Sequence, residues 1–126
     1  MSLRTPLGRV LGLGSAKDGT DHFISQRISA IALALLGLWF LYSMLTIESL
    51  SYLDVLRFIA SPINAVLLSL LSITVCYHAW LGVQVVIEDY VHAPGLKIFS
   101  LIASRFAHAF IAIVCVYSIL VLGLGA

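Results

Sequence analysis

Charge is scarce in this sequence, and the shortage excludes several classes of protein. Only 10% of the 126 residues are charged, whereas 61% are hydrophobic. A soluble domain carries a charge on about a quarter of its residues, so this chain is not an ordinary water-soluble domain. Its formal net charge of +1 provides no basic surface for phosphates, and we expect no nucleic-acid partner.

Cysteine is also scarce, and the chain has no convincing phosphate-binding motif. Cys76 and Cys115 are the only cysteines. Both fall in apolar runs, where we expect small packing residues rather than the halves of a disulfide. The sequence Gly-Leu-Gly-Ser at 12–15 follows no strand pattern and precedes no Gly-Lys-Ser/Thr, so we interpret it as a hinge.

Long apolar runs are what the chain does contain. Three stretches carry no charged residue, at 28–47, 58–87 and 106–126. A helix that spans a membrane needs about 20 apolar residues. We therefore predict an all-α membrane protein with a single domain. It has a polar arm at 1–20 and three transmembrane helices at 21–47, 62–90 and 96–124.

Local signals set these boundaries. Asp21 can cap the first helix, because its carboxylate can accept the amide protons of the first turn. Ser61 and Pro62 are typical of a helix start, with serine as the cap and proline at the first helical position. The sequence Ala-Pro-Gly at 93–95 is expected to separate the last two helices, because proline cannot continue the hydrogen-bond ladder and glycine allows the turn.

Positive charge predicts the orientation in the membrane. Only Arg57 lies in the first link, whereas the other basic residues lie in the arm or near the second turn: Arg4, Arg9, Lys17, Arg27, Lys97 and Arg105. The N-terminus and the turn at 88–97 are therefore predicted to face the cytoplasm. The first apolar run is too long and too late for a signal peptide, and Asp18 and Asp21 are unusual in a transit peptide. We thus expect a bacterial inner membrane rather than a mitochondrial one.

His78 is the most informative candidate functional residue in the sequence. It is an ionisable side chain near the middle of a predicted membrane helix, about 15 Å from the inner end, and such residues commonly have a function. Neutral imidazole is a common ligand of haem iron. Gly82, one turn away on the same face, allows a flat ring to approach the backbone. A histidine that only hydrogen-bonds a neighbouring helix is an equal alternative.

Further polar residues lie near the inner ends of the first two helices. Tyr90 is either part of an aromatic belt at the membrane surface or a hydrogen-bond donor to a quinone carbonyl, with Asp89 assisting proton transfer. Both end the second helix, roughly 17 Å from His78. Arg27, close to His22, either reaches lipid phosphates or pairs with a carboxylate such as a haem propionate.

The third helix contributes a second polar pair. Arg105 and His108 are three residues apart and share one face. His108 lies at a depth similar to that of His78, so the two histidines can in principle hold one haem within a single chain. A self-contained bis-histidine b-type cytochrome is therefore an open alternative at this point.

Two stretches of the sequence resemble a known family. The first is Gly-Ser-Ala-Lys-Asp-Gly at 14–19, followed by His-Phe at 22–23 and Gln-Arg-Ile-Ser-Ala at 26–30. The second is Tyr-His-Ala-Trp-Leu-Gly at 77–82, followed by Glu-Asp-Tyr-Val at 88–91. Together they are similar to the smaller, haem-bearing membrane anchor of succinate dehydrogenase (succinate:quinone oxidoreductase, respiratory complex II).

The resemblance implies a role for five residues. His78 matches the axial ligand of the haem b iron. Tyr90 matches the tyrosine that hydrogen-bonds a ubiquinone carbonyl, and Asp89 matches its acidic neighbour. Arg27 and, less closely, His22 match residues near the haem propionates and the quinone pocket.

The resemblance also implies partners. The second axial histidine of the family comes from a second membrane anchor, with which this chain forms a heterodimeric helical bundle, and His108 is then a packing or polar contact. Electrons from succinate reach the quinone through a flavoprotein subunit and an iron–sulfur subunit, so this chain carries no succinate chemistry. A fumarate reductase anchor and a structural or transport-related three-helix membrane protein are the alternatives.

Overall fold

The computed structural model describes residues 16–125, which are helical apart from short connections. Four helices follow one another: α2 (Ala16–Thr46), α3 (Tyr52–Ala60), α4 (Pro62–Tyr90) and α5 (Pro94–Leu124). The hinge predicted at 12–15 and most of the predicted arm lie outside the described residues. Three spans are long and apolar enough to cross a membrane, namely Thr20–Thr46, Pro62–Tyr90 and Pro94–Leu124. The prediction of an all-α protein with three transmembrane helices is confirmed.

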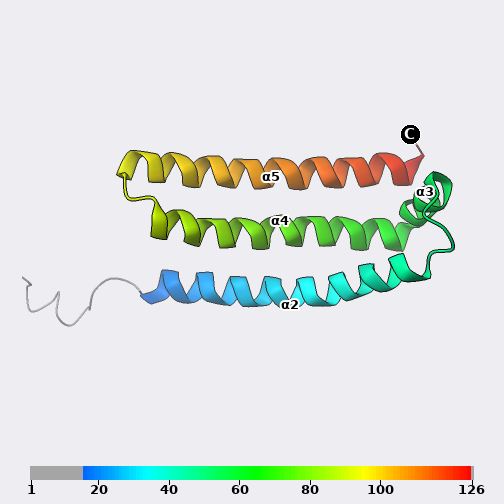
Figure 1. Cartoon of the computed structure of the whole chain (residues 1–126), viewed down its shortest axis with the longest axis horizontal. Coiled ribbons are helices and arrows are strands. Elements are labelled where there is room, and N and C mark those ends of the chain that lie inside the picture. The colour runs from blue at the N-terminus through cyan, green and yellow to red at the C-terminus, as the bar shows by residue number, and fades with distance from the viewer. Residues whose placement is uncertain (1–15, 126) are drawn as a thin grey trace, which may run out of the picture.

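The three long helices lie side by side, with α4 in the middle (Figure 1). The start of α2 and the turn between α4 and α5 lie at one end of the row, whereas α3 and the end of α5 lie at the other (Figure 1). His22, Arg27, Asp89 and Tyr90, from the start of α2 and the end of α4, are therefore grouped toward one end of the molecule. His78 and His108 lie further along the row.

Very little of this arrangement is buried. Among the described residues, only Ser29, Cys76 and Leu81 are buried, and both cysteines are free thiols. Large apolar side chains are exposed along every long helix. Exposed apolar surface of this extent is typical of contact with lipid or with another protein.

The start of the first helix differs from the prediction. The helix begins at Ala16, so Asp21 lies inside it and the prediction that Asp21 caps it is wrong. A single glycine in a helix interior costs only about 1 kcal/mol, and Gly19 therefore does not stop the helix from extending upstream.

The break between the last two helices is also shorter than predicted. α5 begins at Pro94, with Ala93 as its N-cap, and Gly95 lies in its first turn. Proline is well suited to that position, because its missing N–H has no partner at the start of a helix anyway. The prediction for Ser61 is confirmed in position only: it is the N-cap of α4, with Pro62 next, but its side chain makes no capping hydrogen bond.

The short helix α3 was missed by the sequence prediction, which had a link there. Ser51 caps it, because its Oγ accepts a hydrogen bond from the Asp54 amide at 3.3 Å. The Ser51 hydroxyl also donates to the Asp54 carboxylate at 2.7 Å. This bond, together with one from Ser49 and the nearby Arg57, holds the pKa of that carboxyl below its ordinary value. The signal was present in the sequence as a serine followed three residues later by an acid.

Candidate functional site

His78 lies at the interface between α4 and α2 and has a neighbour at each ring nitrogen. Its Nδ1 lies 2.9 Å from Ser29 Oγ. Its Nε2 lies 3.4 Å from the side-chain nitrogen of Gln26, which is longer than a typical hydrogen bond. Both neighbours belong to α2, so the histidine singled out in the sequence faces another transmembrane helix rather than lipid.

Three polar residues of α2 form a stripe on the face toward α4, and we call His22, Gln26 and Ser29 the α2 stripe. Their spacing of four and three residues places them on one side of a helix. The His22 Nε2 and Gln26 Oε1 atoms are buried and have no hydrogen-bond partner among the described residues. An unsatisfied buried polar atom costs about 1–3 kcal/mol, so the stripe has hydrogen-bonding capacity that a bound polar group can use.

Gln26 and Ser29 were not predicted as site residues. Their contacts with His78 join α2 and α4, which are far apart in the sequence, and periodicity within one helix cannot reveal such contacts. A signal was nevertheless available. Gln26 and Ser29 lie four and seven positions after His22, so the three polar residues share one face of a membrane helix, and polar residues on such a face can form interhelical hydrogen bonds.

Gly82 shares the α2-facing side of α4 with His78. A Cβ atom added there would lie 4.0 Å from the Gln26 side-chain nitrogen. The nearest neighbour of Gly82 across the interface is thus the end of a flexible side chain rather than backbone. The prediction that Gly82 shares the face of His78 is confirmed.

Arg27 lies on another face of α2. Its guanidinium carbon lies 4.9 Å from the centre of the Phe23 ring, in a cation–π contact within the same helix. Arg27 is exposed and makes no ion pair among the described residues. The structure therefore places His22 in the α2 stripe and Arg27 on the outer surface beside it.

Asp89 and Tyr90 lie at the end of α4, and both are open to the surroundings. Tyr90 is 77% exposed, and no side-chain hydrogen bond of either residue is present within residues 16–125. The turn next to them is held by Lys97, whose Nζ donates to the backbone oxygen of Glu88 at 2.7 Å. The phenol and the carboxylate are thus free to bind a group that approaches the end of α4.

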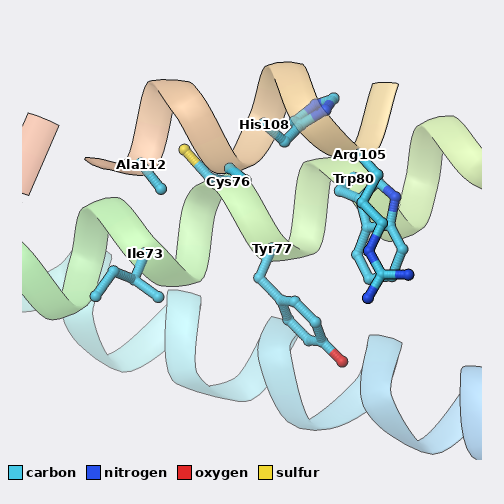
Figure 2. A pocket seen from close by; sticks show the side chains of 8 residues that line it. Ile73, Cys76, Tyr77, Trp80, Arg105, His108 and Ala112 are labelled. Atoms are coloured by element: carbon cyan, nitrogen blue, oxygen red, sulfur yellow. The ribbon is translucent and has the colours of Figure 1, made fainter. Parts of the chain in front are cut away.

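A groove between α4 and α5 contains the second polar pair (Figure 2). Arg105 reaches over the indole of Trp80, with its guanidinium carbon 5.3 Å from the ring centre (Figure 2). His108 Nδ1 lies 2.8 Å from the backbone oxygen of Ser104, one turn earlier in the same helix. The residues that line the groove are Ile73, Cys76, Tyr77, Trp80, Arg105, His108, Ala109 and Ala112.

The two membrane histidines do not meet. His78 contacts α2, whereas His108 lines the groove on the α5 side of α4. No group of three or more His, Cys, Asp or Glu residues that can hold a metal ion occurs in the described part of the chain. The single-chain arrangement in which both histidines hold one haem has no support in this geometry.

Comparison with known proteins identifies the family. The sequence matches the succinate dehydrogenase/fumarate reductase transmembrane subunit family over residues 1–122. It is 40% identical over 94 residues to the succinate dehydrogenase hydrophobic membrane anchor subunit of Rickettsia bellii, which is 75% of each chain. It is 39% identical over 85 residues to that of Rickettsia conorii, which is 67% of this chain and 68% of the relative.

A relative from another genus extends the likeness over nearly the whole length. The succinate dehydrogenase hydrophobic membrane anchor subunit of Paracoccus denitrificans is 32% identical over 122 residues, which cover 97% of this chain and 94% of the relative. The bacterial relatives and the three apolar spans fit a multi-pass bacterial membrane protein. The chain belongs to the succinate dehydrogenase/fumarate reductase transmembrane subunit family, as a membrane anchor of succinate dehydrogenase.

Proposed function

We propose that this anchor holds one side of a haem b and forms part of the site at which ubiquinone is reduced. The observation that carries the proposal is the placement of His78, a histidine inside the membrane that faces the neighbouring helix with one nitrogen on a buried serine. The chain belongs to the membrane anchors of succinate dehydrogenase, an oxidoreductase, and a role for His78 in electron transfer fits that membership.

The residues around His78 fit a haem. Haem iron binds a neutral imidazole through a nitrogen lone pair, and the polar neighbour of His78 Nε2 is the flexible amide of Gln26. Gln26 must turn aside for the ligand to bind. The unpartnered His22 Nε2 and Gln26 Oε1 atoms offer polar contacts next to the proposed position, and Gly82 leaves room beside it.

Each residue has a defined task in this proposal. His78 would hold the iron through Nε2, and a histidine of the second membrane anchor would hold it as well. When bound, the haem supplies one-electron redox chemistry within the membrane. His22 and Arg27, near the start of α2, are proposed to hydrogen-bond and neutralise the propionates, since a guanidinium matches the two oxygens of a carboxylate.

The proposed quinone site lies at the end of α4. The Tyr90 phenol would donate a hydrogen bond to one quinone carbonyl, and Asp89 beside it would pass on a proton. Reduction of a quinone to a quinol takes two electrons and two protons, so a donor and an acid at the same place suit the reaction. The exposure of both side chains supports access for a lipid-soluble substrate.

We propose that the electrons come from outside this chain. A flavoprotein subunit would oxidise succinate, and an iron–sulfur subunit on the cytoplasmic side would carry the electrons to the quinone near Tyr90. The orientation is that predicted from the basic residues, with the start of α2 and the α4–α5 turn on the cytoplasmic side. The start of α2 and the α4–α5 turn lie at the same end of the row of helices (Figure 1), as this orientation requires.

Purification through a tag on this chain tests the proposal. We expect a flavoprotein, an iron–sulfur protein and a second anchor to co-purify, and a reduced-minus-oxidised spectrum to show a b-type haem. In the His78→Ala complex the haem signal should be lost or strongly altered. A wild-type complex without haem, or an unchanged spectrum in the variant, would refute the haem assignment.

A fumarate reductase anchor is the second candidate, because the matched family includes both enzymes. The named relatives favour succinate dehydrogenase. The direction is tested by comparing succinate oxidation by ubiquinone with fumarate reduction by a low-potential quinol in the same purified complex. Faster fumarate reduction would favour this second candidate.

A further inference from the structure

A short chain of hydrogen bonds leads from His78 to the backbone of α2. The His78 Nδ1 atom lies 2.9 Å from Ser29 Oγ, and Ser29 Oγ lies 3.0 Å from the backbone oxygen of Gln26. Ser29 is only 5% exposed and is the single buried polar residue in the described part of the chain. The serine hydroxyl therefore meets the imidazole away from water and lipid.

The directions of these bonds follow from what each group can donate. A hydroxyl has one proton, and the Gln26 carbonyl can only accept, so Ser29 donates to Gln26. Its oxygen is then left to accept, and the proton between Ser29 and His78 lies on the Nδ1 of the histidine. The imidazole in this state carries its lone pair on Nε2.

The contact at the other ring nitrogen agrees. The Gln26 side-chain nitrogen is a donor only, and it faces His78 Nε2 at 3.4 Å. A protonated Nε2 would set two donors against each other. The Ser29 contact therefore selects the tautomer with its proton on Nδ1, which is the one that a metal bound at Nε2 requires, and the Gln26 contact is compatible with it.

We propose that Ser29 is a positioning residue for His78, which fixes the tautomer and ring orientation and strengthens the imidazole as a ligand. The inference rests on the proposed haem ligation by His78. A hydrogen bond from the distal N–H of a ligating histidine orients the ring and raises its basicity. A more basic ligand favours ferric over ferrous iron, so the serine lowers the midpoint potential of the haem.

Redox titration of the haem absorption in the purified complex tests this role. In Ser29→Ala we expect the haem to be retained and its midpoint potential to rise, because Nδ1–H loses its acceptor. Ser29→Thr keeps a hydroxyl that can still bond the preceding turn of the helix, and it should stay close to wild type. Electron paramagnetic resonance of the ferric haem should change in the alanine variant and be restored in the threonine variant.

Ser104→Ala is the matched control. The Ser104 hydroxyl lies 3.4 Å from His108 Nδ1, and that nitrogen already has the Ser104 backbone oxygen at 2.8 Å. Removal of this hydroxyl should leave the haem potential unchanged. A shift equal to that of Ser29→Ala would show a general effect of losing a membrane serine and would overturn the inference.

The outcomes separate this inference from the haem assignment. If His78→Ala loses the haem while Ser29→Ala keeps both the wild-type potential and the wild-type resonance spectrum, Ser29 has no positioning role and the ligand assignment stands. If the wild-type complex has no haem, both the haem assignment and the positioning role of Ser29 are wrong. Should Ser29→Ala fail to assemble, Ser29→Cys, with a similar size and a weaker acceptor, must raise the potential for the inference to hold.

Discussion

His78 and His108 are at similar depths on neighbouring helices, yet they are held in different ways. His78 Nδ1 contacts a side chain of another helix, at 2.9 Å from Ser29 Oγ. His108 Nδ1 contacts the backbone of its own helix, at 2.8 Å from the Ser104 oxygen. The first contact ties two helices together at a defined point, whereas the second can form in an isolated helix.

The surroundings of the two histidines also differ in polarity. The interface between α2 and α4 carries the α2 stripe, which has two buried polar atoms without partners among the described residues. The groove between α4 and α5 is mostly apolar, and its Arg105 rests on Trp80. Depth in the membrane alone does not distinguish a ligand from a packing residue. The two histidines differ in their contacts, since His78 meets a side chain of another helix and His108 meets the backbone of its own.

The largest expected effect is on the haem spectrum, when each of the two histidines is substituted in turn. His108→Leu should keep the b-type haem spectrum, because His108 lies on the α5 side of α4, whereas His78→Ala should remove it. The reduced-minus-oxidised spectrum of the purified complexes measures both. Loss of the haem in His108→Leu would break the comparison, because it would make His108 a ligand.

The next largest effect is expected at the end of α4. Tyr90→Phe removes a hydroxyl that is open to the surroundings, and it should slow quinone reduction about a hundredfold to a thousandfold, the scale on which a donor or proton-transfer group acts. Succinate oxidation with a soluble artificial acceptor should be retained, and so should the haem spectrum. Equal loss of both activities would argue for a structural role of Tyr90.

A smaller effect is expected from filling the α2–α4 interface. Gly82→Leu would press on the Gln26 side chain, whose nitrogen lies 4.0 Å from an added Cβ. Overpacking of this kind costs about 1–3 kcal/mol, so we expect lower haem content per complex and a lower melting temperature. Gly37→Leu, at a position where an added Cβ has no neighbour within 4 Å, is the matched control and should change neither.

The smallest effect is expected in the α4–α5 groove. Arg105→Gln removes the contact with Trp80, and a cation–π contact contributes about 0.5–2 kcal/mol, depending on solvation. The melting temperature of the complex should fall slightly, while the haem potential stays at the wild-type value. A shifted haem potential in this variant would show that the two sides of α4 are coupled.

The sequence predicted the long helices well, because the apolar runs are long and bounded by clear signals. α4 spans Pro62–Tyr90, as expected from Ser61, Pro62 and the position of Tyr90. The starts of α2 and α5 were placed too late, since a glycine or an initial proline does not exclude a helix. α3 was missed because a helix of nine residues is too short to show a strong apolar run.

The site was predictable only in part. His78 stands out because it is ionisable and lies within an uncharged run, and Gly82 follows from the helical repeat. Ser29 and Gln26 become visible as its partners only when α2 and α4 are placed together. The same is true of Arg105 and Trp80, which lie on different helices. Spacing within one helix predicts which residues share a face, but not which face meets which neighbour.

The small number of buried residues bears on how the stability of this protein is to be understood. Only three residues are buried within 20–125, where the structure describes burial, so the core of the chain contributes little to its stability and its surroundings contribute much. The melting temperature measured for such a protein depends on the concentrations of whatever binds its folded form. The cellular amount of the chain should accordingly follow the supply of its partners.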